Sequence, residues 1–304
     1  MSGSSRALPH RHEFEAIGTL WQIDTERPLD AAAQRLVASR IDAYDAAFSR
    51  FRSDSLISRA ATQPGTYELP AEAAALCELY RKLFDLTDGA LTPLLGDALA
   101  HWGYDPGYSL RPSPGQPQPL SWPDAIDWQG TTLRTLRSVT LDIGAAGKGQ
   151  LVDLVGNCLV QAGYAEHIVD AGGDLRIRTA EPVRIALEHP YQADQAIGVI
   201  TMNQGAICAS AANRRAWGDG LHHILDGRTG HPVRTVVASW VIASSALLAD
   251  ALATALFCAD PQRLAQHYSF AGLWVHSDGS IGTVASGTSG VSFDSELFTT
   301  SARA

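Results

Sequence analysis

The chain of 304 residues has no long apolar run, no cluster of basic residues and few cysteines. Its most apolar stretch, 241–259, is interrupted by Asp250, so we expect no membrane span. The basic residues are scattered and the formal net charge is −9, which argues against nucleic acid or an anionic membrane as a partner. The widely spaced cysteines exclude a disulfide framework or a zinc site, and we expect reduced core thiols at Cys77, Cys158, Cys208 and Cys258.

The N-terminal region has neither the apolar segment of a secretory signal nor a lipoprotein-type cysteine, so we expect a cytoplasmic protein. We expect residues 1–12 to form a disordered tail. Charged residues make up 18% of the chain and apolar residues 45%, as in soluble globular proteins. We expect a single domain over 1–304, and the Pro-, Gly- and Ser-rich loop 105–123 is the best place for a boundary between subdomains.

Hydrophobic periodicity predicts more strands than helices. We expect helices over 28–48, 71–86, from 150 to Gly163, and over 244–258. We expect strands over 15–24, 133–141, 166–170, 173–179, 182–188, 196–202, 272–276 and 281–285, and a further pair around a turn at 226–232. Most of these strands neighbour one another in an antiparallel sense, so the predicted fold class is α+β, with a mainly antiparallel sheet and packed helices.

A glycine-rich turn lies at 142–149, D-I-G-A-A-G-K-G, between a predicted strand and a predicted helix. Such a turn presents backbone N–H groups at the positive end of a helix, where they can hold a phosphate, and Lys148 adds a cation. The spacing fits neither a Walker A loop nor a dinucleotide fingerprint, because Asp142 and Gly149 stand at required positions of the former. An ordinary tight connection is an equally good interpretation from these residues alone.

Two adjacent histidines, His222 and His223, precede a turn over 226–230 that is rich in turn-forming residues. A histidine titrates near neutral pH and can act as a general base. Neighbouring side chains on a strand point to opposite faces, so at most one of the two can enter a given site. On this pattern alone, one core and one surface histidine is the favoured interpretation.

Asp250 and Thr254 are four residues apart and therefore share one face of a helix that is otherwise apolar. An isolated buried carboxylate costs several kcal/mol, so Asp250 needs a partner. A carboxylate and a hydroxyl one turn apart suit Mg²⁺, and a salt bridge to an arginine is an equal alternative. Asp170 and Asp174 enclose a second glycine pair, for which we expect a hairpin turn and not a ligand role.

Taken together and in this order, the motifs resemble the ApbE family of FAD:protein FMN transferases. The segments that carry the resemblance are A-I-G-T-L-W at 16–21, F-S-R-F-R-S-D-S-L-I-S-R at 48–59, T-D-G-A-L-T-P-L-L-G at 87–96, W-G-Y at 102–104, L-D-I-G-A-A-G-K-G-Q-L-V-D at 141–153, D-A-G-G-D at 170–174, H-H-I-L-D-G-R-T-G-H-P at 222–232 and A-D-A-L-A-T-A-L-F at 249–257. Each is weak alone, but together they span most of the chain. The resemblance implies a T-fold-like architecture.

The resemblance also implies Mg²⁺-dependent transfer of FMN from FAD to a threonine or serine hydroxyl of an acceptor flavoprotein, with release of AMP. His223 would activate that hydroxyl. Mg²⁺ would be held by the side chains of Asp250 and Thr254 and by the backbone carbonyls of Ala145 and Ala253. The residues implied to contact FAD are Ile17, Phe51, Ala90, Leu91, Thr92, Asp142, Lys148 and Ile224, with the Phe51 ring against the isoalloxazine.

The chain departs from the family pattern at four places. Thr92 and Leu94 replace the usual acid and threonine, Gly227 replaces a proline, and 209–213 reads A-S-A-A-N where T-S-G-D-Y is usual. Two alternatives to the transferase therefore stay open. One is a FAD hydrolase that releases FMN and AMP, and the other is a FAD-binding protein without turnover. A P-loop NTPase is opposed by the missing Walker hydroxyl.

Overall fold

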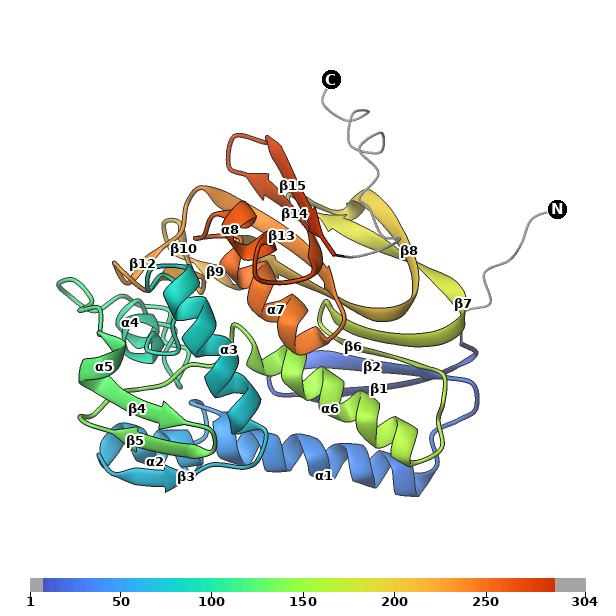
Figure 1. Cartoon of the computed structure of the whole chain (residues 1–304), viewed down its shortest axis with the longest axis horizontal. Helices are drawn as coiled ribbons and strands as arrows, with labels where there is room; N and C mark the ends of the chain where they lie inside the picture. The colour runs from blue at the N-terminus through green and yellow to red at the C-terminus, as the bar shows by residue number, and fades with distance from the viewer. Residues whose placement is uncertain (1–7, 288–304) are drawn as a thin grey trace.

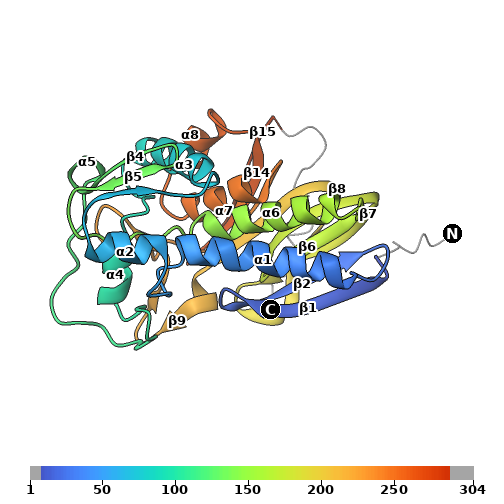
Figure 2. The same cartoon turned by 90° about the horizontal axis from the view of Figure 1, so that it is seen from below.

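An eight-stranded sheet, with helices packed on one face, forms the larger part of the fold (Figures 1 and 2). The computed structural model describes residues 8–287. The strand order is β1-β2-β6-β7-β8-β13-β14-β15, and every neighbouring pair is antiparallel. The strands are β1 (His10–Ala16), β2 (Thr19–Thr25), β6 (His167–Ala171), β7 (Asp174–His189), β8 (Gln192–Ala211), β13 (Val236–Ala243), β14 (Phe270–His276) and β15 (Ile281–Ser286). The predicted α+β class is confirmed.

The N-terminal segment forms a hairpin where we predicted a single strand over 15–24. The chain reverses at Ile17 and Gly18, whose φ angles are 45° and 75°. Positive φ at both central residues is typical of the type I′ turns that join two-residue β-hairpins. The expected disordered tail is wrong from His10 onward, because β1 begins there and pairs with β2. Arg11 strengthens this pairing by donating from Nε to Asp24 Oδ1 at 2.9 Å.

Two predicted strands differ in length from the structure. The segments 173–179 and 182–188 form one continuous strand, β7, and the segment 196–202 lies inside the 20-residue strand β8. The strand predicted over 133–141 is wrong beyond Thr135, where β5 (Thr132–Thr135) ends and an irregular segment leads to the glycine-rich turn. The pair around the 226–232 turn is present as β11 (Leu225–Asp226) and β12 (His231–Pro232).

Three helices cover the inner face of the sheet: α1 (Ala31–Phe48), α6 (Gly147–Gln161) and α7 (Ala246–Ala255) (Figure 2). Asp30 caps α1 by accepting the N–H groups of its first turn, and the buried side chains recur at helical spacing. Asp153 of α6 accepts the first two N–H groups of α7, at 3.0 and 2.9 Å. This contact fixes the start of α7 against α6 and so sets the position of Asp250.

A smaller layer lies beside the sheet, at the left of Figure 1. It contains α2 (Leu56–Thr62), α3 (Ala73–Leu86), α4 (Gly96–His101), α5 (Trp122–Ala125) and a three-stranded sheet of β3 (Thr66–Glu68), β5 and β4 (Ile126–Gln129). The loop between α4 and α5 matches the predicted loop at 105–123. Because β3 pairs with β5 across it, this loop does not separate two subdomains.

The remaining elements are short: the 3₁₀ turn η1 (Ala212–Arg215), β9 (Ala216–Trp217), β10 (Leu221–His222) and α8 (Pro261–Ala265). The four cysteines are free thiols, as predicted. Within residues 8–287, no helix combines the length and the apolar character that crossing a membrane requires.

Candidate active site

The predicted site residues meet in one cavity of about 920 Å³, a volume typical of small-ligand sites. The cavity lies where the smaller layer meets the sheet and α7. Every predicted site residue except Ala253 lines it, namely Ile17, Phe51, Ala90, Leu91, Thr92, Asp142, Ala145, Lys148, His223, Ile224, Asp250 and Thr254. These residues come from segments far apart in the sequence, so the fold brings the separate motifs to one place.

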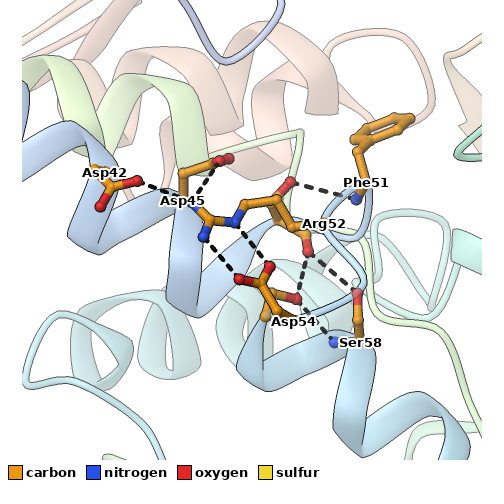
Figure 3. Close-up of polar contacts among 8 residues, drawn as sticks. Asp42, Asp45, Phe51, Arg52, Asp54 and Ser58 are labelled. Atoms are coloured by element: carbon orange, nitrogen blue, oxygen red, sulfur yellow. Dashed lines mark hydrogen bonds and ion pairs between the residues drawn. The ribbon is translucent and has the colours of Figure 1, made fainter.

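The segment that follows α1 contributes consecutive side chains to the cavity lining. Figure 3 shows Arg52 directed at the carboxylates of Asp42, Asp45 and Asp54, while the Phe51 ring points to the other side. The Arg52 guanidinium lies 2.9 Å from Asp42 and 2.9 Å from Asp54. These ion pairs fix Arg52 beside Arg50 and Phe51, and all three residues line the cavity.

Asp142 is fixed by a buried arginine. Arg50 Nε donates to Asp142 Oδ2 at 2.5 Å, and Arg50 Nη1 donates to the Tyr104 carbonyl at 2.9 Å. The other carboxylate oxygen accepts the N–H of Gly144 at 2.7 Å. Asp142 therefore enters the cavity with a defined orientation, and each of its oxygens keeps one lone pair for a ligand.

The backbone N–H groups at the start of α6 are largely used by the chain itself. Gly147 donates to the carbonyl of Ile143 at 2.7 Å, and Gly149 donates to Asp250 Oδ2 at 2.8 Å. The predicted cradle of N–H groups for a phosphate is thus mostly occupied, and the Lys148 side chain is the cation that this turn offers to an anion. Lys148 forms an ion pair with Asp174, a fully buried carboxylate at the start of β7.

The charged groups around Lys148 and Asp174 favour a further cation in the cavity. Burial opposes the charge of Lys148, but Asp174 and Asp250 raise its pKa, so the ammonium persists at neutral pH. Burial, followed by the nearby Asp174 carboxylate, raises the pKa of Asp250 well above its usual range. Asp174 Oδ1 is buried without a hydrogen-bond partner among the described residues. Lys148 alone therefore does not keep Asp250 ionised, and a further cation beside Asp250 would stabilise its charged form.

The donor set implied for Mg²⁺ fits this environment. Thr254 lies one helical turn after Asp250, and its hydroxyl is 3.2 Å from the hydroxyl of Ser210. The Ala253 carbonyl accepts the Ser239 hydroxyl at 2.6 Å and retains a second lone pair. No group of three or more His, Cys, Asp or Glu side chains suited to a metal occurs among residues 8–287. A site here therefore relies on hydroxyl and carbonyl oxygens beside one carboxylate, and Mg²⁺ accepts such hard oxygen ligands.

Gly149 is required by the close approach of α6 and α7. A Cβ atom at this position would lie 2.2 Å from the Ala246 carbonyl oxygen and 2.6 Å from Asp250 Cβ. We expect Gly149→Ala to lower the free energy of unfolding by about 2 kcal/mol, because overpacking here must move backbone. Urea denaturation checks this. Gly156→Ala in the same helix is the matched control, since its Cβ would meet only side-chain atoms, His167 Nε2 at 3.3 Å and Arg176 Cγ at 3.5 Å.

If Gly149→Ala unfolded at the same urea concentration as the unchanged protein, the tight α6–α7 packing described above would be contradicted. A large loss for Gly156→Ala and a small one for Gly149→Ala would contradict it equally.

The two histidines have different environments, as the alternation of side chains predicted. His222 donates from Nε2 to the Val233 carbonyl at 2.8 Å and accepts the Ile224 N–H at Nδ1, at 3.2 Å. His223 lines the cavity, and its buried Nδ1 has no hydrogen-bond partner among the described residues. Burial lowers the pKa of His223 to about 3, and nearby Arg215 contributes to the shift. The His223 imidazole is therefore neutral at physiological pH and able to accept a proton.

Gly227 and Thr92, which both differ from the usual family residues, lie in contact. Gly227 donates its N–H to the Ala90 carbonyl at 2.8 Å, a bond that proline cannot make. A Cβ at this position would lie 2.5 Å from the Thr92 methyl carbon and 2.5 Å from the Gly89 carbonyl oxygen. The turn after the histidines is thereby held against the 89–92 segment, so two departures from the family pattern form one contact.

Sequence reasoning missed several residues that line the cavity, among them Arg50, Tyr104, Tyr108 and Arg215. Arg215 donates to the Tyr104 hydroxyl at 2.5 Å, and burial raises the pKa of Tyr104 to about 12. Arg50 and Tyr104 lie inside segments that carry the family resemblance, so those segments contained a signal for them. Tyr108 and Arg215 lie outside these segments and are recognised only from the structure.

Comparisons with known proteins agree with the geometry. A sequence model of the ApbE family matches residues 17–272. The FAD:protein FMN transferase of Escherichia coli is 26% identical over 290 residues, covering 87% of this chain and 82% of that protein. The FAD:protein FMN transferase of Haemophilus influenzae is 29% identical over 239 residues, covering 70% of this chain and 68% of that protein.

A solved structure supports the fold independently. The crystal structure of the ApbE protein of Thermotoga maritima superposes with a TM-score of 0.79 at 24% identity. The superposition covers 91% of this chain and 97% of the Thermotoga maritima chain, so nearly the whole architecture is shared. The family match spans most of the described residues and includes all the predicted site positions. The chain belongs to the ApbE family.

Proposed function

We propose that this protein transfers FMN from FAD to a threonine or serine hydroxyl of an acceptor flavoprotein, in a Mg²⁺-dependent reaction that releases AMP. The observation that carries the proposal is the convergence of Lys148, the Asp250–Thr254 pair and the neutral His223 in one cavity. Its relatives carry the name FAD:protein FMN transferase, which supports the same chemistry. The volume of about 920 Å³ suits a dinucleotide.

The reaction breaks the phosphoanhydride bond of FAD and forms a phosphoester bond to the acceptor. The acceptor hydroxyl oxygen forms a bond to the FMN phosphorus, and the bond from that phosphorus to the oxygen bridging to AMP breaks. The hydroxyl proton passes to the His223 imidazole, which is neutral and whose Nδ1 has no hydrogen-bond partner within residues 8–287. Lys148 stabilises charge on the phosphate oxygens.

Bound Mg²⁺, held by Asp250, Thr254 and the carbonyls of Ala145 and Ala253, would supply further charge neutralisation at the pyrophosphate. The chain's own groups orient this site. Gly149 donates to Asp250, and Ser210 lies within hydrogen-bond distance of Thr254. Because Ser239 also holds the Ala253 carbonyl, the proposed ligands are fixed from α6, β8 and β13.

Incubation of the purified protein with FAD, with and without Mg²⁺, tests the proposal. FAD, FMN and AMP are quantified by chromatography in the presence and absence of an acceptor domain. AMP release that requires both Mg²⁺ and acceptor supports the transferase. Release of free FMN and AMP without acceptor labelling identifies a hydrolase, and FAD that stays bound and intact identifies a binding protein without turnover.

The depressed pKa of His223 predicts the pH dependence of the reaction. A general base loses activity as pH falls through its pKa, and for His223 this pKa is about 3. We therefore expect the rate at saturating FAD to show no histidine-type decline between pH 8 and pH 5. A pH–rate profile checks this, and an acidic limb near the ordinary histidine pKa of ~6.5 that disappears in His223→Ala would contradict it.

A further inference from the structure

Arg215 lines the cavity as a cation without a carboxylate partner. Among residues 8–287, the lysine and arginine side chains that line the cavity are Arg50, Arg52, Lys148, Arg214 and Arg215. Ion pairs join the first four to carboxylates: Arg50 to Asp142, Arg52 to Asp45, Lys148 to Asp174 and Arg214 to Glu188. Arg215 forms no ion pair with a carboxylate of the described residues; its side chain donates to a phenol instead. Its charge can therefore bind an anion that enters the cavity.

The Arg215 guanidinium is held by Tyr104. Arg215 Nη1 donates to the Tyr104 hydroxyl at 2.5 Å, and the guanidinium carbon lies 5.7 Å from the centroid of the Tyr104 ring. Tyr104 is itself fixed, because it is 4% exposed and its carbonyl accepts Arg50 Nη1 at 2.9 Å. A guanidinium carries five N–H groups in a rigid planar fork, and this contact uses one of them. Arg215 is thus oriented while most of its N–H groups stay free for a ligand.

The same tyrosine places Arg215 beside the proposed base. The rings of Tyr104 and His223 have centroids 6.4 Å apart. After burial, the charge of Arg215 is the largest cause of the lowered pKa of His223. Both the contacts through Tyr104 and this electrostatic effect put the guanidinium close to His223.

The position of His223 restricts where the reacting phosphorus can lie. The acceptor hydroxyl must be within hydrogen-bond distance of the base and almost in contact with the phosphorus, so the phosphorus lies within about 6 Å of the His223 ring. Arg215 borders this space. Each phosphate of FAD brings a negative charge, and Lys148 already shares its own charge with the fully buried Asp174. The unpaired guanidinium is the side chain that can balance the charge of the phosphate next to His223.

We infer that Arg215 binds the phosphate that is transferred as FMN and stabilises the negative charge on its non-bridging oxygens during transfer. Because FAD supplies this phosphate, the assignment rests on the proposed function. Arg215 stays protonated throughout, and the hydroxyl proton still passes to His223. Charged donors fixed around a reacting phosphate act mainly in the transition state. Loss of Arg215 should therefore lower kcat for transfer more than it raises KM for FAD.

Arg215→Gln tests this role because it removes the charge and keeps a polar side chain. We expect kcat for transfer to an acceptor domain to fall about 100-fold. Equilibrium dialysis then compares FMN with riboflavin, which has the same rings and ribityl chain but no phosphate. We expect the variant to bind FMN about 10-fold more weakly and riboflavin as tightly as the unchanged protein does. Arg215→Met, which keeps the apolar stem, is a second variant without the charge.

Three further variants separate charge from packing. Arg215→Lys keeps the charge without the planar fork, so it should recover part of the FMN affinity that Arg215→Gln loses. Tyr104→Phe removes the hydrogen bond to Arg215 but keeps the ring and the charge, so its loss of FMN binding should be much smaller. Arg184→Gln is the matched control, because Arg184 is exposed on β7 and does not line the cavity. Its FMN binding and transfer rate should be unchanged.

Undiminished FMN binding and transfer in Arg215→Gln and Arg215→Met would overturn the inference. Equal losses for FMN and riboflavin would overturn it too, because they would assign Arg215 a packing role; urea denaturation shows whether each variant is folded. In both results the unchanged protein still transfers FMN, so the proposed function stands. An unchanged protein that neither binds FMN nor releases AMP from FAD is a different result, and it would overturn the proposed function together with this inference.

Discussion

Replacing Asp250 by asparagine is expected to lower Mg²⁺-dependent AMP release from FAD by a factor on the order of a thousand. The substitution removes the only side-chain charge in the proposed metal-ligand set but keeps the shape of the residue. The amide oxygen can still accept the Gly149 N–H, so the α6–α7 contact is retained. Initial rates of AMP release at several Mg²⁺ concentrations measure the effect.

The control for this variant is Asp127→Asn, a change of the same chemistry on the exposed face of β4. We expect it to leave the rate unchanged. We also expect Asp250→Asn to unfold no more easily than the unchanged protein, because a buried carboxylate with a raised pKa is costly to ionise. A stable Asp250→Asn variant with full Mg²⁺-dependent activity would contradict the proposed metal site.

Replacing His223 by alanine is expected to slow FMN transfer by about 10²- to 10⁴-fold, the usual contribution of a general base. FAD affinity should change little, because the proposed role concerns the acceptor hydroxyl. Transfer rate and FAD binding are therefore measured on the same preparation. His222→Ala is the matched control. It removes hydrogen bonds to Val233 and Ile224, so we expect it to lower the free energy of unfolding and to leave the transfer rate at saturating substrate largely unchanged.

The contrast between the two histidines decides the assignment. If His222→Ala abolished transfer in a folded protein while His223→Ala did not, the assignment of the base would be wrong. If neither affected transfer, another group would activate the acceptor hydroxyl.

The sequence predicted the elements whose patterns are local and strong. Helix α1 follows from Asp30 as a cap and from apolar side chains at helical spacing, and α7 follows from the run around Asp250. The hairpin turn at Ile17 and Gly18 was missed because a single glycine with no proline, asparagine or aspartate beside it is a weak turn signal. The length of β8 was missed because its second half contains small residues whose strand pattern is weak.

In the candidate site too, local motifs were predictable and contacts between distant segments were not. Motif residues such as His223, Lys148 and Asp250 were predicted from chemistry and family resemblance, and the structure brings them into one cavity. The occupancy of the Gly149 N–H at the start of α6 could not be predicted, because its acceptor, Asp250, comes from a segment about 100 residues away. The stacking of Tyr108 on Phe51 was likewise not predictable, because the 103–110 loop has left-handed backbone at Tyr108 and Leu110 that the sequence does not signal.

The mass of an acceptor flavoprotein domain after incubation with this protein, FAD and Mg²⁺ measures the proposed transfer directly. We expect the intact acceptor to gain the mass of one FMN phosphoester, on a threonine or serine, with one AMP released per transfer. The gain should be absent when Mg²⁺ is chelated and strongly reduced with His223→Ala or Asp250→Asn. An acceptor of unchanged mass, in a reaction where Mg²⁺-dependent AMP and free FMN accumulate, would contradict the transferase and establish hydrolysis.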